Sequence, residues 1–245
     1  MPCKLCLLDK PLRRSHIVPE FMYSKMYDER HRMFGLSTVA SQPVRLLQKG
    51  LRERLLCDDC EQKFGRHESY ARGVFYGETV RKARAHENFL LIEGLIDQPL
   101  KLFFLSLLWR FGVTSIEAFK TCDLGPHEEK LRKMLHAEDP GEYLTYPCMV
   151  FAITWNRKHI PDLIVPPCVA RTDTGRIWSF VVGGFLLSFD VGSHRPPREL
   201  WPAFLKPDGT MVLQIEEITK IQFLHRFASD IARAQRSRKT GTLRK

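Results

Sequence analysis

The hydrophobic positions of the chain change their spacing along its length. In the first 75 or so residues, apolar side chains are scattered among charged ones. Residues 99–111 are apolar on every side of a helical projection, which predicts a buried helix at the core of the middle region. Strand-like spacing follows between residues 147 and 215, and helical spacing returns at residues 218–234. The pattern therefore indicates a polar N-terminal segment followed by a well-packed helical and β-rich region.

Shorter signals complete the predicted elements. Pro19 suits the first position of a helix over residues 19–28, and Asp58 and Asp59 suit the N-terminus of a second helix. Gly183 and Gly184 predict a two-residue hairpin turn. Further helices are expected at 115–122 and 126–136, and strands at 33–39, 44–47, 89–96, 148–155, 163–165, 169–171, 177–182, 185–191 and 211–214.

The order of these elements predicts an α+β protein with a small antiparallel sheet and a C-terminal helix. We divide it into a zinc-binding module at residues 1–75, an α+β domain of unknown role at 76–236 and a basic tail at 237–245. The longest apolar runs are shorter than the ~18 residues that indicate a membrane span. No secretory signal is visible at the N-terminus, so we expect a cytoplasmic protein with no membrane partner.

The chain carries a large excess of positive charge. Its 38 lysines and arginines against 28 acidic residues give a net charge of +10, and 44% of its residues are hydrophobic. The hydrophobic content excludes a disordered chain, and the charge favours a polyanionic partner. Basic residues crowd the first 75 positions together with Tyr23, Tyr27 and Phe34, a mixture that suits phosphate contacts and base stacking. An ordinary solvated surface is the alternative, because acidic residues are also frequent there.

Four of the seven cysteines form two C-x-x-C pairs, Cys3 with Cys6 and Cys57 with Cys60. Two thiolates at this spacing reach one ion, so two pairs supply the four soft ligands of a closed tetrahedral zinc site. A thioredoxin-type redox motif would need a βαβ context, which the pattern around these pairs does not predict. Because all four positions are filled, the predicted zinc is structural, and any chemistry must lie beside it.

The residues beside the cysteines also follow a pattern: C-x-x-C, then H-I-x-P, then L-C-x-x-C. The matching positions are Cys3, Cys6, His16, Ile17, Pro19, Leu56, Cys57 and Cys60. This order resembles the HNH, or ββα-metal, nucleases of the zinc-stapled kind. The resemblance covers about the first 70 residues and implies a treble-clef, HNH-like fold for them.

The resemblance implies that His16 is the general base that takes a proton from water. It also implies that positions 15 and 61 hold one divalent ion, magnesium or manganese, which binds the scissile phosphate. Both positions depart from the family, because Ser15 replaces Asp or His and Glu61 replaces His or Asn. His67 and Glu68 follow on the same expected helix and are candidate replacement ligands.

Three functions remain open. The first is a zinc-stabilised nucleic-acid-binding protein that cuts nucleic acid, with His16, Glu61 and His67 at its catalytic site. DNA is the expected substrate, and RNA is the alternative. The second is a catalytically inactive zinc module that binds nucleic acid or protein. The substituted ligand positions favour it, and so does the lack of the family's base-orienting Asn among residues 51–54. In the third, the region from Phe89 onward is the functional domain and the zinc module only targets it.

Overall fold

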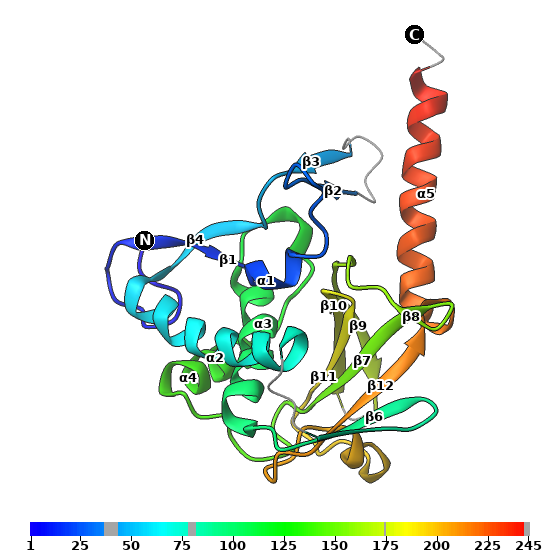
Figure 1. The fold of residues 1–245 in the computed structure, drawn as a ribbon. Helices are drawn as coiled ribbons and strands as arrows, with labels where there is room; N and C mark the ends of the chain where they lie inside the picture. The colour runs from blue at the N-terminus through cyan, green and yellow to red at the C-terminus, as the bar shows by residue number, and fades with distance from the viewer. Residues whose placement is uncertain (37–43, 78–81, 174, 243–245) are drawn as a thin grey trace.

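The computed structural model describes residues 1–36, 44–77, 82–173 and 175–242, with side chains through residue 237 (Figure 1). The N-terminal part consists of short strands and one long helix. Its elements are β1 (Leu12–His16), α1 (Glu20–Tyr23), β2 (Met33–Gly35), β3 (Arg45–Leu47), β4 (Arg52–Cys57) and α2 (Asp58–Tyr76). β1 pairs antiparallel with β4, and β2 pairs antiparallel with β3. The β2–β3 hairpin is thus an insertion between the two strands of the first sheet.

The middle region contains the most hydrophobic helix. Its elements are β5 (Lys82–Ala85), β6 (Phe89–Glu93), α3 (Asp97–Val113), a 3-10 turn (Glu117–Phe119) and α4 (Pro126–Ala137). Every residue of α3 from Leu100 to Phe111 is buried. This burial confirms the expected core helix, and it includes the polar side chains of Lys101 and Arg110, which need internal partners.

An eight-stranded sheet forms most of the C-terminal half. Its remaining strands are β7 (Cys148–Trp155), β8 (Lys158–His159), β9 (Val165–Thr172), β10 (Gly175–Val182), β11 (Phe185–Val191) and β12 (Met211–Glu217). The strand order is β5-β6-β12-β7-β11-β10-β9, with β8 pairing β7. A two-residue turn at Gly183 and Gly184, both at positive φ, joins β10 to β11 as predicted. A 3-10 helix (Arg198–Ala203) lies between β11 and β12.

The helices α2, α3 and α4 lie on one side of this sheet, as Figure 1 shows. Phe111 of α3 contacts Phe180 of β10, with ring centroids 4.6 Å apart, and Phe75 of α2 contacts Phe185 of β11 at 4.7 Å. One cluster of buried apolar side chains includes these residues together with Leu56 of β4. The hydrophobic core is therefore continuous between the N-terminal strands and the sheet, and the division at residue 75 stays a prediction.

The C-terminal helix α5 (Gln222–Thr242) stands away from the rest of the chain in Figure 1. Its first turns pack on the sheet through Leu224 and Phe227. The predicted helix ends at residue 234, whereas the backbone stays helical to Thr242, so most of the predicted basic tail continues the helix. The side chains after residue 237 and all of residues 243–245 lie outside the described part of the chain.

Several sequence-based expectations were wrong in detail. The sheet is neither small nor purely antiparallel, because the polar strand β5 extends its edge and β12 runs parallel to β7. The helix expected at 19–28 ends at Tyr23, and Asp28 instead accepts backbone hydrogen bonds from Arg30 and Arg32 in a turn. The expected helix at 115–122 is only a 3-10 turn at Glu117–Phe119, and the Ser115 N–H and hydroxyl groups before it donate to Glu53.

Strand boundaries also differ from the sequence-based expectation. The strands expected at 163–165 and 169–171 are one continuous strand, β9. The strand expected at 33–39 ends at Gly35, and residues 37–39 lie outside the described part of the chain. No helix among the described residues has the length and apolar content needed to cross a bilayer.

Candidate metal centre and a polar site around His16

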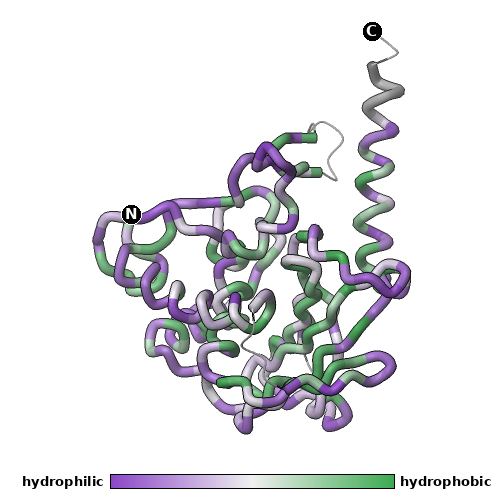
Figure 2. Tube along the Cα trace, viewed as in Figure 1, coloured by the Kyte–Doolittle hydropathy of each residue, from purple (hydrophilic) through white to green (hydrophobic). Residues whose placement is uncertain are grey.

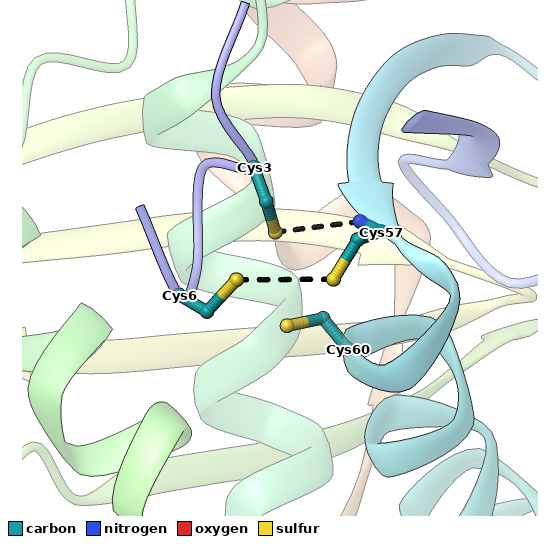
Figure 3. Close-up of side chains that lie close together, drawn as sticks. All are labelled: Cys3, Cys6, Cys57 and Cys60. Carbon is teal, nitrogen blue, oxygen red and sulfur yellow. Dashed lines mark hydrogen bonds between the residues drawn. The ribbon is translucent and has the colours of Figure 1, made fainter. Parts of the chain in front are cut away.

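The four paired cysteines converge at one point, as predicted (Figure 3). Their sulfur atoms all lie within 4.8 Å of one another, and the Sγ atoms of Cys6 and Cys57 are 3.8 Å apart. A tetrahedral zinc ion with Zn–S bonds of about 2.3 Å places its sulfur ligands about 3.8 Å from each other. The cluster therefore has the donor set and the size of a structural zinc site.

Two separate elements hold the cysteines in place. Cys3 and Cys6 lie on a tight N-terminal turn, closed by a hydrogen bond from the backbone N–H of Leu7 to the carbonyl of Cys3. Cys57 ends β4, and Cys60 lies in the first turn of α2. The backbone N–H of Cys57 also donates to the Cys3 sulfur at 3.3 Å. The second cysteine pair thus sits at a helix start, as the sequence predicted.

The surroundings of the cluster act differently on its thiols, because burial raises the pKa of Cys6 and Cys60, whereas Cys3 has a lowered pKa. Burial raises the pKa of Cys3, but hydrogen bonds from nearby backbone N–H groups outweigh it and lower that pKa to about 7. The cations of Lys10 and Arg132 lie close enough to interact with Cys6, and Arg132 also donates to the carbonyl of Leu5 at 2.6 Å. Four thiolates around one zinc carry a net negative charge, which these cations partly balance.

His16 ends β1, at the opposite end of the β1–β4 pair from Cys57, and its side chain faces Glu20. His16 Nε2 lies 2.7 Å from Glu20 Oε2, although the carboxylate is out of line for a hydrogen bond. Arg52 lies directly opposite His16 on β4, and its guanidinium is 3.5 Å from the same Glu20 oxygen. The Tyr27 hydroxyl donates to Glu20 Oε1 at 2.8 Å. Glu20 thus joins a histidine, an arginine and a tyrosine into one polar site.

The polar site contains buried atoms without a hydrogen-bond partner. In the described part of the chain, buried side-chain atoms of this kind include His16 Nε2, Arg52 Nε and Glu61 Oε1. Burial lowers the pKa of His16, Arg52 lowers it further, and Glu20 partly offsets both. Buried polar atoms normally find partners, so Arg52 Nε and Glu61 Oε1 indicate room for ordered water or another ligand, whereas His16 Nε2 faces Glu20.

Ser15 and Glu61, at the two substituted family positions, contact each other. The Ser15 hydroxyl accepts a hydrogen bond from the backbone N–H of Leu56 at 3.1 Å, and it also bonds Glu61. Burial raises the pKa of Glu61, while the bond from Ser15 opposes that shift. The hydrogen bond from Leu56 to Ser15 thus adds a side-chain link between β1 and β4.

Arg110 of α3 connects the polar site to the hydrophobic core. It is 2% exposed, and its Nη1 donates to the His16 carbonyl at 3.0 Å and to Glu68 Oε1 at 2.8 Å. Its remaining hydrogen bonds go to the carbonyl and hydroxyl oxygens of Ser106. Glu68 also raises the pKa of His16, so this carboxylate lies within electrostatic range of the imidazole.

The third expected site residue, His67, has other partners. Its Nε2 lies 3.4 Å from Glu138, which follows α4, and Lys63 and Arg66 contact the same carboxylate. Burial lowers the pKa of His67, and Glu138 opposes this shift. These contacts tie α2 to α4, whereas His16 faces α1 and β4. The role expected for His67 in catalysis stays a prediction.

The sequence did not indicate Glu20 or Arg110 as site residues, and Arg52 was expected only as one of the basic residues that suit phosphate contacts. Glu20 follows His16 by four positions, a spacing that could have drawn attention to it. Arg52 occupies the stretch where the family's orienting Asn is expected. Arg110 gave no usable signal, because its partners lie far away in the sequence.

Comparison with known protein families, with characterised proteins and with solved structures gave no match. Among the described residues, the four cysteines are the one group of three or more histidine, cysteine and acidic side chains close enough to share a metal ion.

Proposed function

We propose that the N-terminal module is a zinc-stabilised nucleic-acid-binding unit that hydrolyses phosphodiester bonds at His16, with DNA as the expected substrate. The observation that carries the proposal is the pairing of His16 with Glu20 at 2.7 Å, beside the guanidinium of Arg52. An imidazole with a lowered pKa is neutral at physiological pH and available as a base. A carboxylate beside it orients the ring and stabilises the imidazolium that forms.

The order of the surrounding elements supports the resemblance to ββα-metal nucleases. β1 and β4 form an antiparallel pair that leads directly into α2, with His16 at the end of β1 and the second cysteine pair at the start of α2. The treble-clef identity of this unit is part of the proposal. The positive charge of the chain supports a polyanionic substrate.

In the proposed reaction, Glu20 lies against Nε2 of His16, which leaves Nδ1 to take the proton from the attacking water. Arg52, with its unpartnered Nε, would hold a phosphate oxygen, since guanidinium groups match phosphate geometry. Glu20 in this arrangement replaces the orienting Asn that the chain lacks. The three residues thus supply a base, an orienting carboxylate and an anion-binding group.

The family chemistry also uses one divalent ion, which stabilises charge on the leaving oxygen. Magnesium is usually bound through one or two carboxylates together with substrate phosphate. Glu61, whose buried Oε1 has no hydrogen-bond partner, fits such a role and is the residue we propose to hold the ion. His67 is left out of the proposed site because it contacts Glu138.

The second candidate function is an inactive zinc module that binds nucleic acid without cutting it. The contact between Ser15 and Glu61 favours this alternative, because the serine hydroxyl is occupied by Leu56 N–H and by Glu61. The position that provides a metal ligand in the family then has a structural role.

The deciding experiment incubates the purified full chain with supercoiled plasmid, single-stranded DNA and RNA, with magnesium or manganese added against metal-free buffer. We expect cleavage by the native chain and none by His16→Ala, with zinc content and nucleic-acid affinity unchanged. His194→Ala is the control, since His194 is exposed and lies after β11. Binding without cleavage in the native chain would establish the inactive module, and loss of zinc in His16→Ala would assign His16 a structural role.

A further inference from the structure

The β2–β3 hairpin has one face packed inward and one face exposed. Met33 pairs with Leu47 and Phe34 pairs with Leu46, so the two pairs lie on opposite faces. Met33 is 4% exposed and belongs to the hydrophobic core, with Leu47 packed against it. Phe34 is 67% exposed and Leu46 is 53% exposed. The outward face therefore presents two large apolar side chains to solvent.

This apolar face extends beyond the paired strands. Leu36 and Val44 follow at two-residue spacing from Phe34 and Leu46, and they are 51% and 43% exposed. We call these four residues, Phe34, Leu36, Val44 and Leu46, the hairpin patch. Figure 2 shows hydrophobic colour on this hairpin, which projects from the body of the chain. Antiparallel strands normally present polar residues to water, and gathered exposed apolar groups mark binding sites.

The hairpin is anchored at the end of the β1–β4 pair where His16 lies. The chain leaves β1 at His16 and returns to β4 at Arg52, and these two residues are directly opposite each other. Ile17 N–H donates to the carbonyl of Leu51, and Leu51 N–H donates to the hydroxyl of Tyr23. The segment that forms the hairpin therefore leaves and re-enters the β1–β4 pair at His16 and Arg52.

The charges around the hairpin patch select the class of partner. Arg30, Arg45 and Lys49 are exposed and lie near it in the sequence, with Arg45 on the opposite face of the hairpin, whereas Arg32 is paired with Asp28. An apolar surface with cations near it in the sequence complements a chain that carries phosphates and flat apolar rings together. In a duplex the faces of the bases are stacked and hidden, whereas a single strand exposes them to an aromatic side chain.

We propose that the hairpin patch binds unpaired bases of single-stranded nucleic acid, with Phe34 as the stacking residue. This inference rests on the proposed function and specifies its substrate: the strand that reaches His16 is single-stranded at the adjoining nucleotides. Phe34 supplies a ring face, and the three aliphatic side chains supply apolar contacts to neighbouring bases. The cations near the patch in the sequence contact the phosphates.

The test measures the affinity of the full chain for a fluorescein-labelled 30-nucleotide single strand and for the matching duplex, at several salt concentrations. Base–aromatic stacking contributes about 1–3 kcal/mol per base, so Phe34→Ala should weaken single-strand binding by about tenfold or more. The dependence on salt should stay unchanged, because Phe34 displaces no counterions. Arg45→Gln should lower the slope of log K against log salt by about 0.7.

Trp155→Ala is the matched control, because Trp155 is an aromatic residue of β7 with 55% exposure outside the hairpin. Leu46→Ala is a second hairpin variant, and circular dichroism checks that each variant folds. If the native chain binds the single strand and both Phe34→Ala and Leu46→Ala bind it with unchanged affinity, the role of the hairpin patch is overturned while the proposed function stands. A native chain that binds no nucleic acid overturns the proposed function as well. Light scattering measures whether the native chain is a dimer. If it is, and if Phe34→Ala is a monomer, the patch binds a second copy of this chain, and the inference is overturned.

Discussion

Arg110 Nη1 donates a hydrogen bond to the backbone carbonyl of His16 at 3.0 Å, across 94 positions of sequence. The same nitrogen donates to Glu68 Oε1 at 2.8 Å. One buried guanidinium therefore fixes the end of β1 relative to α2 and α3. The position of the His16 imidazole depends on this contact, because the carbonyl and the side chain belong to the same residue.

Replacing Arg110 should destabilise the fold strongly. Arg110→Met leaves the Glu68 carboxylate and the His16 carbonyl without their partner, and breaking a buried ion pair costs about 3–5 kcal/mol. Because Glu68 remains 25% exposed, we expect a loss of about 3 kcal/mol in the free energy of unfolding, measured by urea titration. Arg84→Met removes the exposed pair with Glu93 and should cost less than about 1 kcal/mol.

A double-mutant cycle separates the ion pair from the loss of packing. Arg110→Met combined with Glu68→Gln should cost less than the sum of the two single changes, because the second substitution removes the carboxylate that the first leaves unpaired. Additive costs would show that the Arg110–Glu68 contact contributes little, and that Arg110 acts only through its hydrocarbon part and its other hydrogen bonds.

The metal centre gives a second prediction. The native chain should bind one zinc ion, measured by elemental analysis, and Cys57→Ser should reduce this content sharply because a serine hydroxyl is a poor replacement for a soft thiolate. Structural zinc contributes on the order of 10 kcal/mol in zinc-finger peptides. A chelator should therefore lower the melting temperature of the native chain.

Cys168→Ser is the control for the metal centre, because Cys168 lies on β9 outside the cysteine cluster. Its zinc content should equal that of the native chain. Stoichiometric zinc in Cys57→Ser, or none in the native chain, would contradict the assignment of the four cysteines to one ion.

The elements that could be predicted from the sequence are those with many apolar residues close together. α3, β7 and β11 were predicted because most of their buried residues are apolar and local in sequence. β1 was missed because only one of its five residues is buried, and that residue is the polar Ser15. β5 was missed because all four of its residues are exposed at a sheet edge. Such strands form through pairing with partners that the local pattern does not reveal.

The candidate site could be predicted only where the sequence spacing of the residues itself indicates a ligand geometry. The four cysteines were found because two C-x-x-C pairs impose a ligand geometry that is independent of the rest of the fold. The link between Glu20 and Arg52 was not found, because it depends on the return of the chain from the β2–β3 hairpin to face β1. The Arg110 contacts likewise require that α3 pack against α2.

Two glycines should respond in opposite ways to the same substitution. Gly184 has φ +77°, and an added Cβ would overlap the carbonyl oxygen of Ile160, whereas Gly65 lies inside α2 with open space around it. Gly184→Ala should destabilise the chain by about 2 kcal/mol or more. Gly65→Ala should stabilise it by about 0.5–1 kcal/mol, because alanine loses less backbone freedom in a helix. Thermal unfolding of both variants checks the pair, and equal shifts would contradict the positive-φ turn.

The pH dependence of the proposed hydrolysis follows from the charges around His16. The reaction needs the neutral imidazole, so its rate should fall as the pH drops through the pKa of His16. Burial and Arg52 hold this pKa below the usual 6.5, while Glu20 raises it. Activity should therefore persist to pH values below 6.5, measured as a single-turnover rate against pH.

Removing the two charges beside His16 should move the acid limb of that profile in opposite directions. Arg52→Gln removes a cation that opposes protonation, so the pKa of His16 rises and the limb moves to higher pH. Glu20→Gln removes a carboxylate that favours protonation, so the limb moves to lower pH. Arg45→Gln, an exposed change in the hairpin, should leave the limb in place. Shifts of the same sign in both site variants, or none in either, would show that a group other than His16 takes the proton.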